Sequence, residues 1–185
     1  MTKAGVLALQ GDFREHAAAF RDLGVPVLEV RTPEELADVD CLAIPGGEST
    51  TMAKLARSAE LVGPIRDRLA SGMPVLGTCA GMIVLASRVD DEEGLLGAID
   101  ISVRRNAYGR QTESFEADVE VRGTGNVRAV FIRAPIVESV DSHVTVLGEH
   151  EGRPVVLEQS NVLVASFHPE LVGETALHAR LLERV

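Results

Sequence analysis

The sequence predicts an α/β fold, a doubly wound and mostly parallel sheet with helices on both faces and antiparallel additions in the C-terminal half. Short apolar runs alternate with amphipathic segments as far as Gly94, a pattern typical of βαβ units. Beyond Gly94 most apolar runs are strand-like, and several are joined by glycine-bearing turns, which favours antiparallel pairs. No repeat, low-complexity run or linker interrupts the sequence, so we expect one domain over residues 1–185.

Apolar periodicity predicts the elements that precede Gly94. Phe13, Ala17, Phe20 and Leu23 recur at steps of four, three and three, so they share one face of a helix. Pro33 at a first helical position, with acidic residues behind it, predicts another helix start. The predicted strands are residues 6–9, 25–30, 41–44 and 75–77, and the predicted helices are 13–23, a segment from 33, 49–61 with Ser49 or Thr50 as its cap, 64–71 opened by Pro64, and 80–86.

The remainder of the sequence predicts mainly strands. Turns at residues 122–125 and 151–153 carry glycine, which accepts the backbone conformations that tight turns require. The predicted strands are residues 99–103, 115–121, 127–131, 144–147, 155–157 and 162–167, and the predicted closing helix is 174–182.

Composition excludes several classes of partner. A net charge of −10 disfavours nucleic acid and anionic membranes, and six aromatic residues are too few for a base-stacking surface. No apolar run reaches the roughly 18 residues of a membrane span, and no segment resembles a secretory signal, so we expect a cytoplasmic protein. Cys41 and Cys79 should then be free thiols, and because their spacing does not suit zinc we expect no metal site there.

Cys79 lies in the pattern G-x-C-x-G, between a predicted strand and a predicted helix. Glycines on both sides permit the sharp turn that lifts a nucleophile above a sheet, and the N–H of Ala80 would stand ready for an oxyanion. The alternative is that Cys79 is a small buried side chain beside a helix-packing glycine. Its place at a strand-to-helix junction favours the nucleophile.

His168 and Glu170 follow the last predicted strand with Pro169 between them. Proline pushes the preceding residue into an extended conformation, in which residues two apart project to the same side. Glu170 could therefore hold one imidazole nitrogen while the other faces a thiol, as in a Cys-His-Glu triad. Taken alone, this pattern is better explained as a strand-terminal histidine with a solvated neighbour. Beside the elbow motif, and because the carboxyl ends of parallel strands share one edge of a sheet, the triad is favoured.

Other polar positions carry weaker signals. Gly46 and Gly47 could bring backbone N–H groups close to a ligand, Gly47 as a second oxyanion donor, or they could form a plain turn. Arg105 and Arg133 could clamp a substrate carboxylate, although surface ion pairs are the commoner use of arginine. We expect a solvated turn at residues 90–93, inert burial of Cys41, and solvent-facing side chains for the histidines outside the triad, which are His16, His143, His150 and His178.

Six motifs, spread over nearly the whole sequence and in the same order, resemble those of one family. They are residues 9–16 (LQGDFREH), 45–52 (PGGESTTM), 77–83 (GTCAGMI), 105–111 (RNAYGRQ), 131–135 (FIRAP) and 167–171 (FHPEL). The chain resembles the glutaminase subunits of pyridoxal 5′-phosphate synthase, a branch of the triad, or class I, glutamine amidotransferases. The cysteine and His-Pro-Glu motifs are common to the superfamily, whereas the two arginine motifs and the region of Gln10 select the branch.

The resemblance implies a role for each matching residue. Cys79 is the nucleophile, His168 the acid–base and Glu170 its orienter, with Gly47 and Ala80 as the oxyanion hole. Gln10 belongs to the interface with the partner. The implied glutamine-binding residues are Gly46, Gly47, Glu48, Ser49, Arg105, Ile132 and Arg133.

The resemblance also implies a partner for the chain. L-glutamine would be hydrolysed with no metal or cofactor required. The ammonia would pass to a TIM-barrel synthase subunit whose dodecameric core carries one glutaminase subunit on each copy. Two alternatives are an amidotransferase that feeds a different synthase and a catalytically silent regulatory subunit. Two departures from the family pattern, Asp12 and residues 172–174, are expected to leave the triad untouched, and Asp12 to alter the partner surface.

Overall fold

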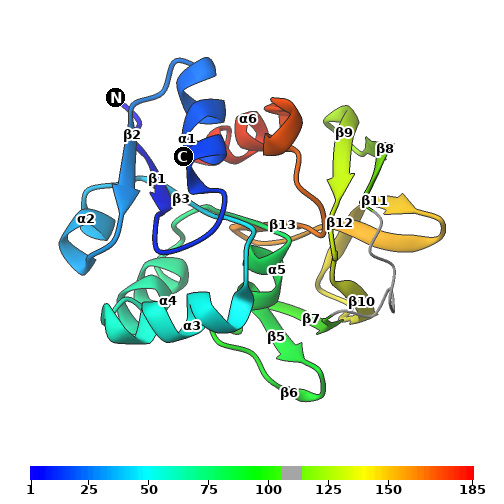
Figure 1. Cartoon of the computed structure of the whole chain (residues 1–185), viewed down its shortest axis with the longest axis horizontal. Coiled ribbons are helices and arrows are strands. Elements are labelled where there is room, and N and C mark those ends of the chain that lie inside the picture. The colour runs from blue at the N-terminus through cyan, green and yellow to red at the C-terminus, as the bar shows by residue number, and fades with distance from the viewer. Residues whose placement is uncertain (106–113) are drawn as a thin grey trace.

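A computed structural model describes residues 1–105 and 114–185. Its main sheet has seven strands and lies between two groups of helices (Figure 1). The strands of this sheet are β1 (Ala4–Leu7), β2 (Val27–Val30), β3 (Cys41–Ile44), β4 (Val75–Thr78), β11 (Thr145–His150), β12 (Arg153–Gln159) and β13 (Val162–Ala165). They lie in the order β11-β12-β13-β4-β3-β1-β2. The pairs from β13 to β2 are parallel, whereas β11–β12 and β12–β13 are antiparallel. The predicted fold class is therefore confirmed.

Helices cover both faces of this sheet, with α1 and α6 above it and α3, α4 and α5 below it in Figure 1. The helices are α1 (Phe13–Asp22), α2 (Pro33–Ala37), α3 (Ser49–Ser58), α4 (Val62–Ala70), α5 (Ala80–Leu85) and α6 (Ala176–Leu182). Side chains alternate between the two cores along a strand: Leu42 and Ile44 join one core, whereas Cys41 and Ala43 join the other. Burial on both faces explains why the strand reads as an unbroken apolar run.

Two smaller sheets extend the C-terminal half. Their strands are β5 (Ala86–Val89), β6 (Glu92–Glu93), β7 (Ile99–Arg104) and β10 (Ile136–Val140) in one sheet, and β8 (Phe115–Val121) and β9 (Gly125–Phe131) in the other. β5, β6 and β10 were not predicted. β6 has two exposed glutamates, and β5 begins directly where α5 ends, so neither has a periodicity of its own.

Helix starts differ from expectation at three places. The carboxylate of Glu48, not Ser49 or Thr50, caps α3, because it accepts hydrogen bonds from Thr50 N (2.9 Å) and Thr51 N (2.7 Å). α4 begins at Val62 rather than at Pro64, since proline is tolerated within a first helical turn. α6 begins at Ala176, two residues later than its predicted start.

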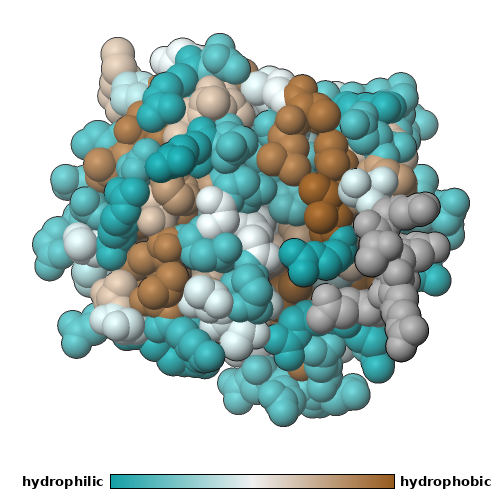
Figure 2. Space-filling view, in the orientation of Figure 1, coloured by the Kyte–Doolittle hydropathy of each residue, from teal (hydrophilic) through white to brown (hydrophobic). Residues whose placement is uncertain are grey.

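The surface seen in Figure 2 is mainly hydrophilic, with apolar areas between the polar side chains. Leu171 and Val172, in a short 3₁₀ helix, η1 (Glu170–Val172), are among the exposed apolar side chains of the described residues. Among the described residues, no helix combines the length and the apolar character needed to cross a membrane.

Gly81 allows α5 to pack directly on β3. A Cβ atom at Gly81 would lie 2.1 Å from the carbonyl oxygen of Ile44, a backbone atom that cannot move aside cheaply, whereas a Cβ atom at Gly63 in α4 meets nothing within 4 Å. We expect Gly81→Ala to lower the free energy of unfolding by about 1–3 kcal/mol. The matched change Gly63→Ala should leave it unchanged or raise it by up to about 1 kcal/mol. Urea denaturation measures both, and equal effects of the two changes would contradict this packing.

Candidate active site

Three loops meet at one edge of the sheet because β3, β4 and β13 are parallel neighbours. Their carboxyl ends carry the glycine segment after Ile44, the cysteine after Thr78 and the histidine segment after Ala165. A cleft of about 680 Å³ opens there. It is lined by Gln10, Asp12, Gly47, Glu48, Ser49, Thr50, Cys79, Ile83, Asp90, Arg105, Ile132, Arg133, His168 and Leu171.

Cys79 occupies a strained turn between β4 and α5. Its backbone has φ 48° and ψ −103°, outside the regions that side chains other than glycine prefer. Two close approaches hold the turn, since a Cβ atom at Gly77 would lie 2.7 Å from the carbonyl carbon of Gly81, and the N–H of Cys79 donates to the oxygen of Ala165 (2.8 Å). The thiol lies in the cleft, 3.8 Å from the carbonyl oxygen of Ile132. The local geometry is that of a nucleophile elbow.

His168 lines the same cleft as Cys79. The backbone N–H of His168 donates to the carbonyl oxygen of Val130 (2.8 Å), and this hydrogen bond anchors the segment to β9. Nδ1 lies 2.8 Å from Oε1 of Glu170, the contact that the sequence predicts. The extended conformation expected beyond His168 is wrong, because Pro169 is helical (φ −70°, ψ −32°) and Glu170 begins η1. The turn of η1, rather than strand alternation, brings the carboxylate back to the ring.

Asp12 reaches the same imidazole nitrogen, contrary to expectation. Its Oδ2 lies 2.7 Å from Nδ1 of His168, so the expectation that this departure leaves the triad untouched is wrong. The pKa of Asp12 lies below the usual range, so its carboxylate is ionised and only accepts hydrogen bonds. Nδ1 of His168 therefore carries the proton and donates to Asp12, and Oε1 of Glu170 lies close to the same nitrogen. Nothing in the sequence distinguishes this aspartate from an ordinary helix cap.

The imidazole of His168 favours its charged form. Burial alone lowers the pKa of His168, but the hydrogen bond to Asp12, the nearby thiol of Cys79 and the hydrogen bond to Glu170 outweigh burial and raise it well above the usual range. An imidazolium beside a thiol favours the thiolate, the form in which a cysteine is nucleophilic.

The remaining predicted residues lie around the cleft, and two of them lie just behind its wall. A Cβ atom at Gly46 would lie 2.1 Å from Cε1 of His168, so this glycine backs the imidazole, while Ala80 starts α5 directly behind the thiol. Gly47 has φ 137°, and a Cβ atom there would lie 2.5 Å from Oε1 of Gln10. That same oxygen accepts a hydrogen bond from Glu48 N (2.9 Å). The rest of the RNAYGRQ motif, residues 106–111, lies outside the described residues.

Arg105 is held in the cleft wall by a residue that the sequence analysis placed in a solvated turn. The guanidinium Nε of Arg105 donates to Oδ2 of Asp90 (2.7 Å), and its Nη1 donates to the hydroxyl of Thr50 (3.1 Å). The backbone N–H of Arg105 donates to Oδ1 of Asp90 (2.9 Å). The arginine is thus both a partly exposed ion pair and a cleft residue. A run of acids gives no indication of which member will pair.

His16 and His178 are fully buried, so the expectation that they face solvent is wrong. Nδ1 of His16 lies 2.8 Å from Nε2 of His178, and Nε2 of His16 lies 2.9 Å from the hydroxyl of Thr78. Burial lowers the pKa of both histidines, that of His16 to about 4, so both are neutral at pH 7. His16 matches the apolar period of α1, a signal that could have indicated its burial.

Asp12, His16 and Glu170 have side-chain atoms within 4.8 Å of one another, close enough to raise the question of a metal. Both nitrogens of His16 already have hydrogen-bond partners, and the two carboxylates share Nδ1 of His168. The group therefore fits a hydrogen-bonded network, and we do not assign it to a metal.

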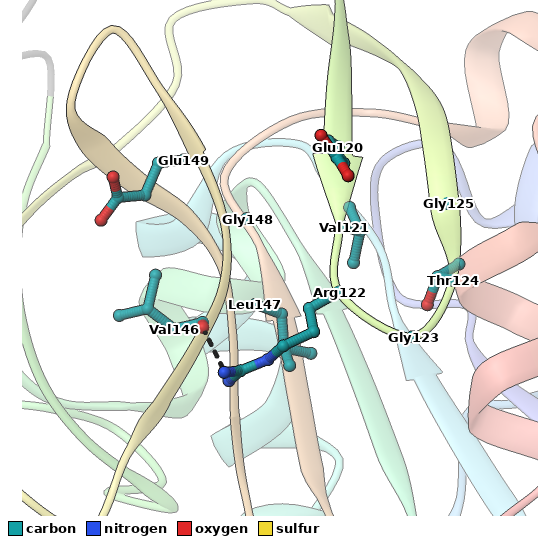
Figure 3. A pocket seen from close by; sticks show the side chains of 10 residues that line it. All are labelled: Glu120, Val121, Arg122, Gly123, Thr124, Gly125, Val146, Leu147, Gly148 and Glu149. Atoms are coloured by element: carbon teal, nitrogen blue, oxygen red, sulfur yellow. Dashed lines mark hydrogen bonds between the residues drawn. The ribbon is translucent and has the colours of Figure 1, made fainter.

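A larger pocket, of about 890 Å³, lies away from these residues (Figure 3). It opens between the β8–β9 turn and β11, where Nη2 of Arg122 donates to the oxygen of Val146 (3.1 Å). Its lining contains no cysteine or histidine and none of the predicted site residues. Size alone therefore does not locate the chemistry of this chain.

Solved structures share this fold. A chain described as "Crystal structure of glutamine amidotransferase" is 47% identical, with a TM-score of 0.93 and 97% of each chain covered. A chain of "Structure of PurLQS from Thermotoga maritima" is 17% identical, with a TM-score of 0.78 and 98% of each chain covered, and supports the fold alone. The fold, with a cysteine on the elbow and a histidine beside it, is that of a class I glutamine amidotransferase.

Sequence comparison places the chain more narrowly. The model of the SNO glutamine amidotransferase family matches residues 6–185, and the chain belongs to this family. A relative from Mycobacteroides abscessus is 53% identical, covering 98% of this chain and 96% of its own length. Another, from Acidothermus cellulolyticus, is 56% identical over 96% of this chain and 90% of its own length. Both are named pyridoxal 5′-phosphate synthase subunit PdxT.

The buried histidine pair makes a prediction about protonation. A group whose pKa is depressed by folding stays neutral in acid, so His16 should not gain its proton until the pH approaches about 4, and His178 should behave likewise. In the same pH range the unfolded chain binds these protons, so the contribution of the pair to stability falls as the pH decreases from 6.5 toward 4. We expect NMR titration to show two imidazole rings that stay neutral down to about pH 5. The signals of one ring should be missing in His16→Gln, and those of the other in His178→Gln. Protonation midpoints near the usual histidine value for both rings would contradict their burial.

Proposed function

We propose that this chain hydrolyses L-glutamine to L-glutamate and ammonia through a cysteine thioester, as the glutaminase subunit of pyridoxal 5′-phosphate synthase. The observation that carries the proposal is one cleft that holds Cys79 on a strained elbow beside His168, whose Nδ1 proton is fixed by carboxylates. Membership of a glutamine amidotransferase family supplies the substrate class, and the names of the relatives supply the pathway.

Each step of the reaction has a residue for it. The thiolate of Cys79 attacks the side-chain amide carbon of glutamine, and the N–H groups of Gly47 and Ala80 receive the charge that builds on the oxygen. One such donor typically contributes about 2.7–4 kcal/mol to the rate. His168 gives a proton to the nitrogen, because an amide anion is too basic to leave, and ammonia departs. Water, deprotonated by His168, then cleaves the thioester and releases glutamate and Cys79.

The cleft walls supply charges of both signs for the amino acid end of glutamine. Arg105 and Arg133 lie where either can bind the α-carboxylate, with Ser49 and Ile132 completing the wall. Glu48 offers a negative charge for the α-ammonium group. Hydrogen bonds from the hydroxyl of Thr51 and from the N–H groups of Thr50 and Thr51 lower the pKa of Glu48 to about 2, so it is ionised at pH 7.

A synthase subunit receives the ammonia in this proposal. In bulk water ammonia would be protonated to ammonium, which is not a nucleophile, so a docked partner with an enclosed path is required. We take that partner to be a TIM-barrel subunit with a dodecameric core, each copy carrying one glutaminase subunit. Gln10 belongs to the docking face, and its side-chain contact with Glu48 N gives that face a direct link to the oxyanion loop.

The cysteine that carries the chemistry can be tested against the other cysteine of the chain. We expect Cys79→Ala to reduce glutamate release from glutamine by at least about a thousandfold in the complex with the synthase subunit, because the nucleophile is gone. Cys41→Ala should keep its activity, since Cys41 is buried in β3 and burial raises the pKa of its thiol to about 12.

Binding of the synthase subunit, measured by ultracentrifugation, should be the same for wild type and Cys79→Ala. Turnover of glutamine by Cys79→Ala would remove the nucleophile assignment. A wild-type complex that releases no ammonia would point instead to a silent regulatory subunit, and a product other than pyridoxal 5′-phosphate would point to a different synthase.

A further inference from the structure

Asp12 makes a contact that the Cys-His-Glu triad does not account for. Two carboxylates meet the single Nδ1 proton of His168, with Oδ2 of Asp12 at 2.7 Å and Oε1 of Glu170 at 2.8 Å. Asp12 comes from the loop after β1, whereas Glu170 follows β13, so independent parts of the fold supply the two acceptors. The shared proton makes the two side chains members of one site.

Helix capping does not explain the position of this side chain. Asp12 is the residue before α1, the place where aspartate usually accepts a hydrogen bond from the first helical turn. Its side chain makes no such bond, and Oδ1 has no hydrogen-bond partner. The Asp12 carboxylate therefore contacts His168 instead of the N–H groups of the first turn of α1.

The backbone around Asp12 is built to permit this approach. Gly11 has φ 89°, and a Cβ atom there would lie 1.8 Å from the carbonyl oxygen of Gly46. A Cβ atom at Gly46 would in turn lie 2.7 Å from Nδ1 of His168 and 3.1 Å from Oδ1 of Asp12. Two glycines therefore let the loops of β1 and β3 come close enough for the aspartate to reach the imidazole.

Charge distinguishes the two carboxylates. Glu170 is almost completely buried, and burial, opposed by His168 and reinforced by Asp12, raises its pKa well above the usual range. Asp12 is only partly buried, and the hydrogen bond to His168 overcomes that burial and lowers its pKa well below the usual range. The other ionisable group that faces them, His16 at 3.6 Å from Glu170, is kept neutral by burial. Of the two carboxyl groups next to Nδ1 of His168, Asp12 is therefore the one that carries the negative charge.

We propose that Asp12 is a second positioning residue of the catalytic centre: it carries the negative charge opposite the His168 imidazolium, while Glu170 fixes the plane of the ring. Asp12 acts through His168 and stabilises the state in which the thiol has given up its proton. The inference rests on the proposed function, because it assumes that His168 pairs with the nucleophile Cys79.

Alkylation of Cys79 by iodoacetamide tests this role without glutamine or the synthase subunit. Asp12→Asn keeps the shape and the capping ability of aspartate but removes the charge. The imidazolium then loses its partner, so the pH midpoint of the alkylation rate should rise by about one unit and the rate at pH 7 should fall about tenfold. Cys41→Ala serves as the common background, so that one thiol reacts.

Glu15→Gln is the matched control, because it removes an exposed carboxylate from the first turn of α1, the helix that follows Asp12, and leaves His168 untouched. We expect its alkylation profile to follow that of the parent. Asp12→Glu keeps the negative charge, so its pH midpoint should lie between those of Asp12→Asn and the parent. In the complex with the synthase subunit, Asp12→Asn should lower kcat with little change in KM.

An unshifted midpoint in Asp12→Asn would overturn the inference, and so would an effect on KM alone, which would make Asp12 a substrate contact. If Asp12→Asn does not fold, Asp12→Ser takes its place, and failure of both to fold would mark Asp12 as structural. Failure of the proposed function would be recognised separately: the alkylation profile of Cys79 would change on Asp12→Asn, but the parent complex would release no glutamate.

Discussion

The parallel pairing of β13 with β4 is the contact on which the whole cleft depends. Val162–Ala165 lies beside Val75–Thr78, and the ladder continues by one bond because the N–H of Cys79 donates to Ala165. Cys79 and His168 are distant in sequence, yet each follows the end of its strand closely. A slip of this register would separate the thiol from the imidazole even if every helix and strand survived.

The cleft lining includes residues in strained backbone conformations. Cys79 (φ 48°) and Arg133 (φ 44°) have positive φ without being glycine, and Gly47 (φ 137°) lines the same cleft. Each non-glycine residue in such a conformation costs about 1–3 kcal/mol, which the surrounding structure must offset. β3 and β4 can do so because they are buried throughout their length, so their carboxyl ends are rigid supports for the turns. The buried strands therefore stabilise the fold enough to offset the strain in the turn at Cys79.

Sequence reasoning succeeded where a local pattern has one physical cause. Buried strands read as apolar runs, and the glycines around Cys79 reflect a turn that few other residues permit. It failed where the cause is a distant partner: Asp12 looks like a helix cap, and His16 looks like a polar residue on an amphipathic helix. Only the folded chain shows that Asp12 meets His168 and that His16 meets His178. Glu170 was placed correctly for a partly wrong reason, because η1 rather than an extended segment turns it toward the ring.

The neutral histidines behind the site complete its electrostatics. Thr78, which precedes Cys79, is hydrogen-bonded to His16, and His16 to His178, so a chain of hydrogen bonds connects β4 with α1 and α6. A second charged imidazole this close to His168 would repel its imidazolium, and burial prevents that by keeping His16 neutral. With His16 neutral, the charged imidazole form is favoured on His168 alone of these two rings. The proposed reaction requires that form, because His168 must give a proton to the departing nitrogen.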